Sequence, residues 1–345
     1  MIFYYSIFLI ISIFSFAKRE SGLKFFVFAG VMLFFIAAFR GEGIDRDYQG
    51  YIEYYNDILE SGFENVEPSF IFITEMVNKF FGSNIYLFII YALLGIFIKL
   101  YAINKLSPQK NIALLVYYSG FFFLHEMTQI RVGIAAGLLL LCIKPIQERD
   151  YKKFIFFSVL AFFFHYSAVI IFPLYFLSDN QVSLKKYSLL LPIAFFLYYF
   201  NINIYHIIYV FDYISIDLIN LKIKSYEGHA LLDSSINIFN FLFLSRCLVA
   251  YILFLRSKEL AAQNKYFIIL LKVYFIGLFV FVAFSSVPGI SSRGAELLFI
   301  VEIILIPALI GIIKEKIFGQ FMVIGASLAS LSFLLFGSQL INPYF

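Results

Sequence analysis

The sequence has no tryptophan and only two cysteines, and charged residues make up 14% of its 345 positions. The two thiols, Cys142 and Cys247, lie apart inside apolar runs, which excludes a disulfide framework and indicates no metal site. No glycine-rich phosphate loop, nucleophile elbow or zinc motif occurs. Without tryptophan, anchoring at a membrane surface depends largely on the 25 tyrosines. The residue pattern therefore does not suggest a soluble nucleotide-binding, hydrolytic or zinc enzyme.

Hydrophobic residues dominate instead, at 62% of the chain, with 47 phenylalanines and a mean hydropathy of +0.90. A backbone that crosses lipid must satisfy its own hydrogen bonds, which favours helices. We therefore predict an all-α protein, a polytopic helical membrane bundle of about 10 to 12 membrane segments, including a broken hairpin at 154–178, that forms one domain over 1–345. The first run has no preceding basic residues and no small-residue cleavage site, so we expect it to be retained. The net charge of +4 is assigned to loops, with membrane lipid and no nucleic acid as partner.

The apolar runs predict membrane spans at 2–17, 25–39, 84–104, 111–124, 130–146, 187–200, 237–255, 266–284, 297–313 and 317–337. Basic residues then collect in alternate loops, which the positive-inside rule assigns to the cytoplasm. These residues are Lys18, Arg19, Lys24, Lys99, Lys105, Lys110, Lys144, Arg149, Lys152, Lys153, Lys185, Lys186, Arg256, Lys258, Lys265, Lys314 and Lys316.

The later basic loops stay on the same side as the earlier ones only if segment 154–178 enters the membrane and returns. A single crossing there would place Lys185 and all later basic loops outside. We therefore predict a broken hairpin that reverses at His165 and Tyr166. The alternative is one ordinary span with inverted topology downstream.

Two long stretches lie outside in this topology. The first, 40–83, is acidic and rich in tyrosine up to Pro68, and then carries apolar residues at helical spacing. This spacing predicts an interfacial helix over 68–82. We expect the two outer stretches, 40–83 and 201–236, to cover the site.

Three arginines, Arg40, Arg131 and Arg293, lie at the outer ends of apolar runs, against the positive-inside tendency. Guanidinium groups bind phosphate oxygens through paired donors at fixed geometry. Their shared face therefore predicts an anionic substrate, and we favour a diphosphate. The structural alternative for Arg131 is an ion pair with Glu126. For Arg293 it is an ion pair with Glu296, and for Arg40 a snorkelling anchor.

His165 lies at the predicted reversal, which would place its imidazole in the outer site as a donor or base. Its alternative role is that of a hydrogen-bonded core histidine. Asp47 is a second candidate, as a base or carbohydrate contact, against the alternative of a solvated acidic loop. Both are therefore predicted as catalytic residues.

Four further residues are predicted to contact sugar: Tyr48, Tyr51, Asp45 and Tyr226. The DxD pattern of Asp45 and Asp47 is used with metals and nucleotide sugars on the cytoplasmic side, so we reject that function here. No metal and no cofactor are expected.

Four motifs together resemble EpsG-like, Wzy-type polysaccharide polymerases. They are RGEGIDRDYQGY at 40–51, QIRVGIAAG at 129–137, FHYSA at 164–168 and the late Arg293. The resemblance covers 40–296, and the doubled acid at Asp45 and Asp47 departs from the family pattern.

The resemblance implies a GT-C-like architecture in the bacterial inner membrane, with a multi-pass chain and a site facing the periplasm. It also implies a glycosyltransferase that joins undecaprenyl-diphosphate-linked oligosaccharide repeat units into O-antigen or a related polysaccharide, without a nucleotide sugar. A chain-length regulator protein is a further candidate partner. In this scheme Arg131 and Arg293 neutralise the departing diphosphate with support from Arg40, and His165 or Asp47 accepts a proton.

Two rival functions remain open. An O-antigen ligase would use the same clamp and differ in its product. A lipid-linked oligosaccharide flippase or transporter should show charged or glycine-broken midplane helices in both halves. Only Lys272 and Arg246 are strong midplane candidates.

Overall fold

A computed structural model describes the chain except for residues 18, 63–64, 201, 203–235 and 345. The described residues form helices and no strands, apart from one isolated antiparallel bridge between Asp45 and Ile341. The predicted all-α class is confirmed. Tyr226 and positions 203–235 of the second outer stretch lie outside the described residues.

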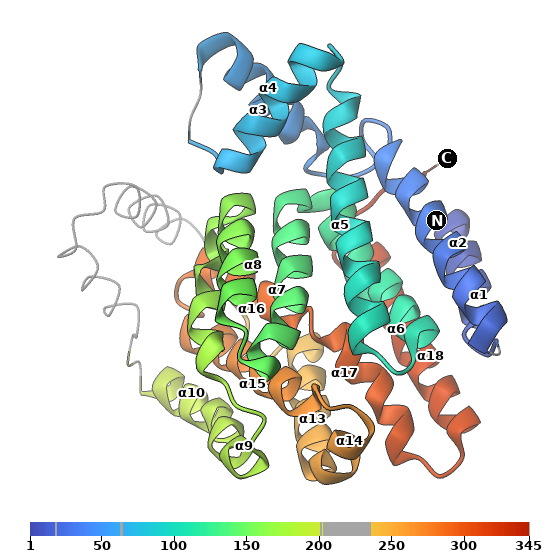
Figure 1. The fold of residues 1–345 in the computed structure, drawn as a ribbon, viewed down its shortest axis with the longest axis vertical. Coiled ribbons are helices and arrows are strands. Elements are labelled where there is room, and N and C mark those ends of the chain that lie inside the picture. Colours follow the sequence, from blue (N-terminus) through green and yellow to red (C-terminus); the bar gives the residue numbers. More distant parts are fainter. Residues whose placement is uncertain (18, 63–64, 201, 203–235, 345) are drawn as a thin grey trace.

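The helices in chain order are α1 Ile2–Phe14, α2 Arg19–Ala38, α3 Tyr48–Ser61, α4 Pro68–Phe80, α5 Ile85–Leu106, α6 Lys110–Tyr117, the π-helix η1 Tyr118–Thr128, α7 Ile130–Glu148, α8 Tyr151–Phe164, the 3-10 helix η2 Tyr166–Phe176, α9 Gln181–Ser188, α10 Leu190–Tyr199, α13 Phe241–Leu255, α14 Ser257–Gln263, α15 Phe267–Ala283, α16 Pro288–Phe299, α17 Glu302–Ala308, the 3-10 helix η4 Leu309–Ile312, α18 Lys316–Ser332 and the π-helix η5 Phe333–Gly337. Figure 1 shows α3 and α4 together at one end of the long axis, above a bundle that contains α7 and α8.

Three helices of the described chain are long and apolar enough to cross a membrane: Ile85–Leu106, Ile130–Glu148 and Lys316–Gly337. The pair Pro288–Phe299 and Glu302–Ile312, bent by 52°, would make a fourth. Five shorter apolar helices accompany them. Large apolar side chains on their outer faces remain exposed, which suits contact with lipid. The chain is a polytopic membrane protein, and many of the predicted spans are shorter or broken helices.

Several predicted spans are not continuous α-helices, and two of them show the kinds of change. The span expected at 111–124 changes at Tyr118 from α-helix to a π-helix that ends at Thr128. The span expected at 297–313 bends between Phe299 and Glu302. Hydropathy alone does not predict a change of helix type or a bend, because the residues on both sides of each break are apolar.

The acidic outer stretch contains a helix that the prediction missed. Tyr51, Tyr55 and Ile58 form the buried side of α3 at helical spacing, and Gly62 ends the helix in a left-handed conformation with φ 65°. The following helix, α4, begins at Pro68 and buries Phe70, Ile73 and Val77, so the predicted helix at 68–82 is present.

The broken hairpin is confirmed. α8 ends at Phe164, the backbone of the next residue, His165, is extended, and η2 then returns along α8. At the open end, the Arg149 guanidinium donates to the Tyr175 carbonyl (2.6 Å), and the Tyr175 hydroxyl donates to the Arg149 carbonyl (3.2 Å). Both ends of the segment therefore lie side by side, and His165 lies at its tip, toward α4.

A buried ion pair fixes α5 against the start of α7. Lys99 Nζ lies 2.5 Å from Glu126 Oε1 and donates to the Gly133 carbonyl (2.6 Å), and the Tyr117 hydroxyl donates to the same carboxylate oxygen (2.9 Å). The prediction that Lys99 belongs to a cytoplasmic loop is wrong, because its side chain is fully buried. Glu126 is also not the partner of Arg131.

Glycines make room for this contact. A Cβ atom on Gly95 would lie 2.0 Å from Glu126 Oε2, and one on Gly133 would lie 2.4 Å from the His125 carbonyl oxygen. The backbone contact at Gly133 leaves no room for a side chain, and a side chain at Gly95 would displace the Glu126 carboxylate from its pair with Lys99. The register of α7, and with it the position of Arg131, depends on this packing.

Candidate functional site

Arg131 lies in the first turn of α7, at the end of the bundle that α3 and α4 cover. Its guanidinium carbon lies 5.7 Å from the ring centroid of Tyr51 and 5.5 Å from those of Tyr54 and Phe70. Glu67, the residue before α4, forms an ion pair with it. With 18% of its side chain exposed, Arg131 is a cation held between aromatic rings and a carboxylate that still reaches the surface.

Glu67 links this arginine to the hairpin tip. Its Oε2 pairs with Arg131 Nη1, and its Oε1 lies 3.8 Å from Nε2 of His165. The Glu67 side chain is only 4% exposed, so its charge depends on these neighbours. The structure thus joins two predicted site residues through a third that sequence reasoning missed. Pro68 marks the helix start beside Glu67, but nothing in the spacing relates position 67 to 131 or 165.

The two ring nitrogens of His165 have different environments. Nδ1 accepts the backbone N–H of Ser167 (3.2 Å) and lies 2.7 Å from the Ser167 hydroxyl. Because a backbone N–H can only donate, Nδ1 is an acceptor and the neutral ring carries its proton on Nε2. His165 therefore presents an N–H toward Glu67. Of the two predicted roles, this arrangement favours the donor over the base.

Asp47 begins α3 and is 39% exposed, with its Oδ1 lying 3.7 Å from Arg46 Nε. Burial raises the pKa of its carboxyl group, although the charges of Arg46, Arg293 and Arg131 oppose the shift. Arg293 is exposed on α16, which packs against α7 and η2. The charges of Arg131 and Arg293 therefore both reach Asp47.

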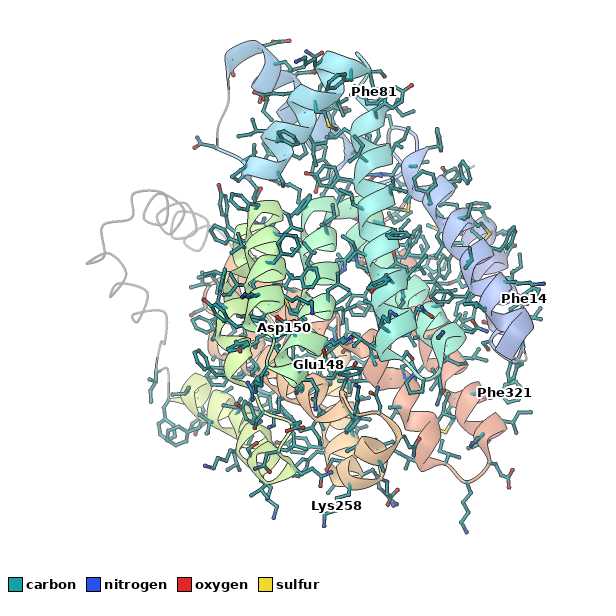
Figure 2. All side chains as sticks on the ribbon, viewed as in Figure 1. Phe14, Phe81, Glu148, Asp150, Lys258 and Phe321 are labelled. Atoms are coloured by element: carbon teal, nitrogen blue, oxygen red, sulfur yellow. The ribbon has the colours of Figure 1, made fainter. Side chains whose placement is uncertain are left out.

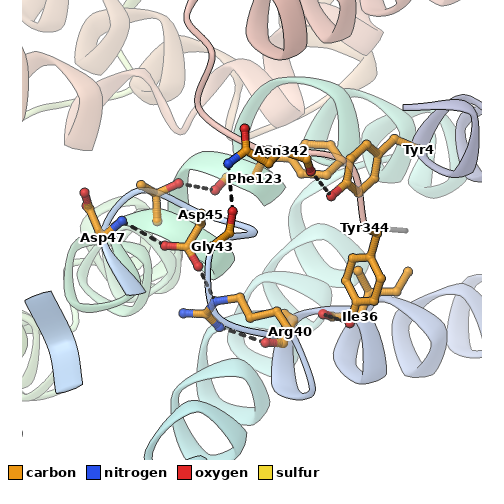
Figure 3. Close-up of polar contacts among 11 residues, drawn as sticks. Tyr4, Ile36, Arg40, Gly43, Asp45, Asp47, Phe123, Asn342 and Tyr344 are labelled. Atoms are coloured by element: carbon orange, nitrogen blue, oxygen red, sulfur yellow. Dashed lines mark hydrogen bonds and ion pairs between the residues drawn. The ribbon is translucent and has the colours of Figure 1, made fainter. Parts of the chain in front are cut away.

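Arg40 and Asp45 form a buried structural pair (Figure 3). Arg40 Nε lies 2.7 Å from Asp45 Oδ2, its Nη1 donates to the Ala37 carbonyl (2.7 Å), and its guanidinium lies 4.4 Å from the ring centroid of Phe88. Asp45 Oδ1 accepts the backbone N–H of Asp47 (3.0 Å). Neither side chain is exposed, which does not favour the predicted contacts of Arg40 with diphosphate and Asp45 with sugar. The pair instead orients the loop that presents Asp47.

The C-terminal segment holds the same loop (Figure 3). Asn342 donates its backbone N–H to the Ile44 carbonyl (2.8 Å) and its side-chain amide to the Gly43 carbonyl (2.7 Å). The Tyr4 hydroxyl donates to the Asn342 carbonyl (2.8 Å). Residues from both ends of the chain therefore support the start of α3.

The predicted sugar-binding tyrosines have distinct surroundings. Tyr48 is half-buried and stacks on Phe88, with ring centroids 4.6 Å apart. Tyr51 is buried beside Arg131, and burial raises the pKa of its hydroxyl to about 12. Tyr54, which sequence reasoning did not select, is half-buried beside the same arginine. Among the described residues, no group of three or more His, Cys, Asp or Glu side chains could hold a metal ion.

Comparison with known proteins then establishes the family. A sequence model of the EpsG family matches residues 23–345. The chain belongs to the EpsG family. The resemblance seen in the motifs is confirmed, and the match extends well beyond them.

This EpsG-family protein is similar to the amylovoran biosynthesis protein AmsC of Erwinia amylovora. The two are 24% identical over 327 residues, which cover 89% of this chain and 84% of AmsC. No solved structure gives a significant match.

Proposed function

We propose that this EpsG-family protein is a polysaccharide polymerase of the bacterial inner membrane. It joins oligosaccharide repeat units carried on undecaprenyl diphosphate into O-antigen or a related exopolysaccharide, without a nucleotide sugar. The family and the name of AmsC, an amylovoran biosynthesis protein, support this assignment. The single observation that carries the chemistry is Arg131, a guanidinium between aromatic rings at one end of a membrane helix.

The polarity of the molecule supports a periplasmic site. Lys258 and the loop with Glu148 and Asp150 lie away from the α3–α4 end, which carries Phe81 (Figure 2). Basic loops are retained in the cytoplasm. In this proposal the hairpin at 154–178 reverses within the membrane, which keeps the basic loops before and after it in the cytoplasm and leaves Arg131 and Asp47 facing the periplasm.

The proposed reaction is a direct glycosyl transfer. A hydroxyl oxygen of the acceptor repeat unit bonds to the anomeric carbon of the donor chain. The bond from that carbon to the diphosphate oxygen breaks, and its electron pair leaves with the diphosphate. Arg131 and Arg293 offset the growing negative charge, and Asp47 takes the hydroxyl proton. His165 orients Glu67, and Tyr48, Tyr54 and Tyr226 are the proposed sugar contacts.

The surroundings of the two midplane candidates favour a transferase over a transporter. Arg246 is bound by Glu302, with Nε 2.8 Å from Oε1, and the Tyr274 hydroxyl donates to the same oxygen (2.7 Å). Lys272 donates to the Asn180 carbonyl (3.1 Å) and to Ser183 Oγ (2.5 Å), which ties the chain after η2 to α15. Both charges therefore have fixed structural partners.

The test is a polysaccharide gel from a polymerase-deficient strain that makes the cognate repeat unit. The strain is complemented with the wild type, Arg131→Ala, or Lys258→Ala as a control that removes an exposed cation elsewhere. We expect a ladder of chain lengths for the wild type and Lys258→Ala, and a single-repeat band for Arg131→Ala. Single-repeat product from all three, with each protein present in the membrane, would reject the polymerase assignment and favour a ligase or flippase.

A further inference from the structure

Glu67 binds the same guanidinium that the proposed function assigns to the diphosphate. Its carboxylate pairs with Arg131 Nη1 inside the ring of Tyr51, Tyr54 and Phe70. A carboxylate and a diphosphate both bind a guanidinium through anionic oxygens. Two anions on one guanidinium repel each other, so the diphosphate competes with Glu67 for Arg131.

A second donor is already in place for Glu67. Its other oxygen lies 3.8 Å from Nε2 of His165. Closing this distance to a hydrogen bond requires a movement of about 1 Å. Because Nδ1 of His165 accepts from Ser167, the neutral ring carries its proton on Nε2, the nitrogen nearer to the Glu67 carboxylate in the ion-pair geometry. The backbone carbonyl of Glu67 accepts the N–H of Phe70 (2.9 Å), so the first turn of α4 holds the main chain while the side chain moves.

We propose that Glu67 is a displaceable internal anion, which a lipid diphosphate moves from Arg131 to His165 on binding and which returns to Arg131 when the product diphosphate leaves. This inference rests on the proposed function, because that function makes Arg131 the diphosphate ligand. Glu67 is thus a positioning residue that keeps the buried guanidinium paired between turnovers, since an unpaired buried charge is costly. By competing with the product, it also shortens the residence of undecaprenyl diphosphate.

The test measures binding of geranyl diphosphate, a short isoprenoid diphosphate, to the full-length protein in nanodiscs. Glu67→Gln keeps the size of the side chain and removes its charge. Glu75→Gln is the matched control, because Glu75 is an exposed acid on the same helix, α4. We expect Glu67→Gln to bind about 10- to 100-fold more tightly than the wild type. This gain corresponds to a wild type in which the Glu67–Arg131 pair is formed in roughly 90 to 99% of ligand-free molecules. Glu75→Gln should match the wild type.

A second variant tests the role of His165. Asn at this position can still accept the N–H of Ser167 but cannot donate to Glu67 from the place of Nε2. We expect His165→Asn to weaken geranyl diphosphate binding about 3- to 10-fold when Glu67 is present. In the Glu67→Gln background the same substitution should have no effect. This dependence on Glu67 would show that the two residues share one interaction. Loss of folding alone cannot make Glu67→Gln bind more tightly. It also cannot make the weaker binding of His165→Asn depend on the presence of Glu67.

Equal or weaker binding by Glu67→Gln would overturn the inference, as would absence of binding by every variant. The gel assay separates this result from the proposed function. A wild-type ladder without tighter binding by Glu67→Gln would leave the polymerase assignment intact and refute the displaceable anion. Tighter binding by Glu67→Gln without any wild-type ladder would support the displaceable anion and refute the polymerase.

Discussion

Two cation–carboxylate pairs lie in different surroundings around α7. Lys99 and Glu126 are fully enclosed, and Tyr117 and the Gly133 carbonyl complete their hydrogen bonds. Arg131 and Glu67 lie at the end of the bundle, where Arg131 is 18% exposed and aromatic rings line it. Every polar partner of the first pair is internal, whereas the second pair keeps part of its cation at the surface, and the proposed function uses that exposed part.

The largest effect is expected from breaking the enclosed pair. Lys99→Ala leaves the Glu126 charge uncompensated in the bundle, which should cost about 3 to 5 kcal/mol of unfolding free energy. The measurement is thermal unfolding in detergent, together with the yield of monodisperse protein. Lys99→Met with Glu126→Gln should recover much of the stability, because no buried charge remains. A Lys99→Ala protein as stable as the wild type would show that the pair is not structural.

The open pair should respond mainly in activity, with a smaller loss of stability because Arg131→Ala leaves the buried Glu67 carboxylate without its cation. Arg131→Ala removes the group that offsets charge on the departing diphosphate, and the rate should fall about 100- to 1,000-fold. Chain extension of a synthetic lipid-linked repeat unit by purified protein measures the rate, and circular dichroism confirms the helices. An Arg131→Ala protein that is inactive only because it unfolds would erase the contrast between the two pairs.

Arg131→Lys sharpens the contrast by keeping the charge and removing the fork of donors. A point charge lacks the paired geometry that a diphosphate requires, so we expect at least about a 10-fold loss of chain extension in the same assay. Lys258→Arg, an exchange of the same two residue types at an exposed position, is the control. Near-normal polymer from Arg131→Lys would exclude a guanidinium clamp.

The smallest effect is expected at the C-terminal support of the loop before α3. Asn342→Ala removes the hydrogen bond from its side chain to the Gly43 carbonyl, which should cost about 0.5 to 1.5 kcal/mol of unfolding free energy. Thermal unfolding measures the cost, and chain extension should fall by less than about 10-fold because Asp47 is still held by Asp45. A loss as large as that of Arg131→Ala would place this support within the site itself.

Several parts of the fold and site could be predicted because they depend on neighbouring residues or on composition. The reversal at His165 followed from charge parity between loops, and the helix after Pro68 followed from apolar spacing. Arg131 was selected because its charge is unusual at the outer end of an apolar run. The missed helix at Tyr48–Ser61 also carries a helical pattern, with Tyr51, Tyr55 and Ile58 as its apolar side, but its acidic residues concealed it.

The pairing of charges could not be predicted in the same way. Glu126 lies five positions from Arg131 and was the nearer candidate by sequence, yet it pairs with Lys99 on another helix. The actual partner of Arg131, Glu67, is 64 positions away. Arg40 was selected by the same reasoning as Arg131, but Asp45 and the packing of Phe88 enclose it.

The amino-acid sequence by itself determined the membrane class, the family motifs and the choice of Arg131, because hydropathy, charge bias and local spacing are properties of short segments. Only the tertiary structure decided which charges are buried, which carboxylate faces which cation, and that Glu67 lies between Arg131 and His165. Those relations depend on how α4, α7 and the hairpin pack, and the free energy of a buried charge depends on its neighbours in space and not on its neighbours in the chain.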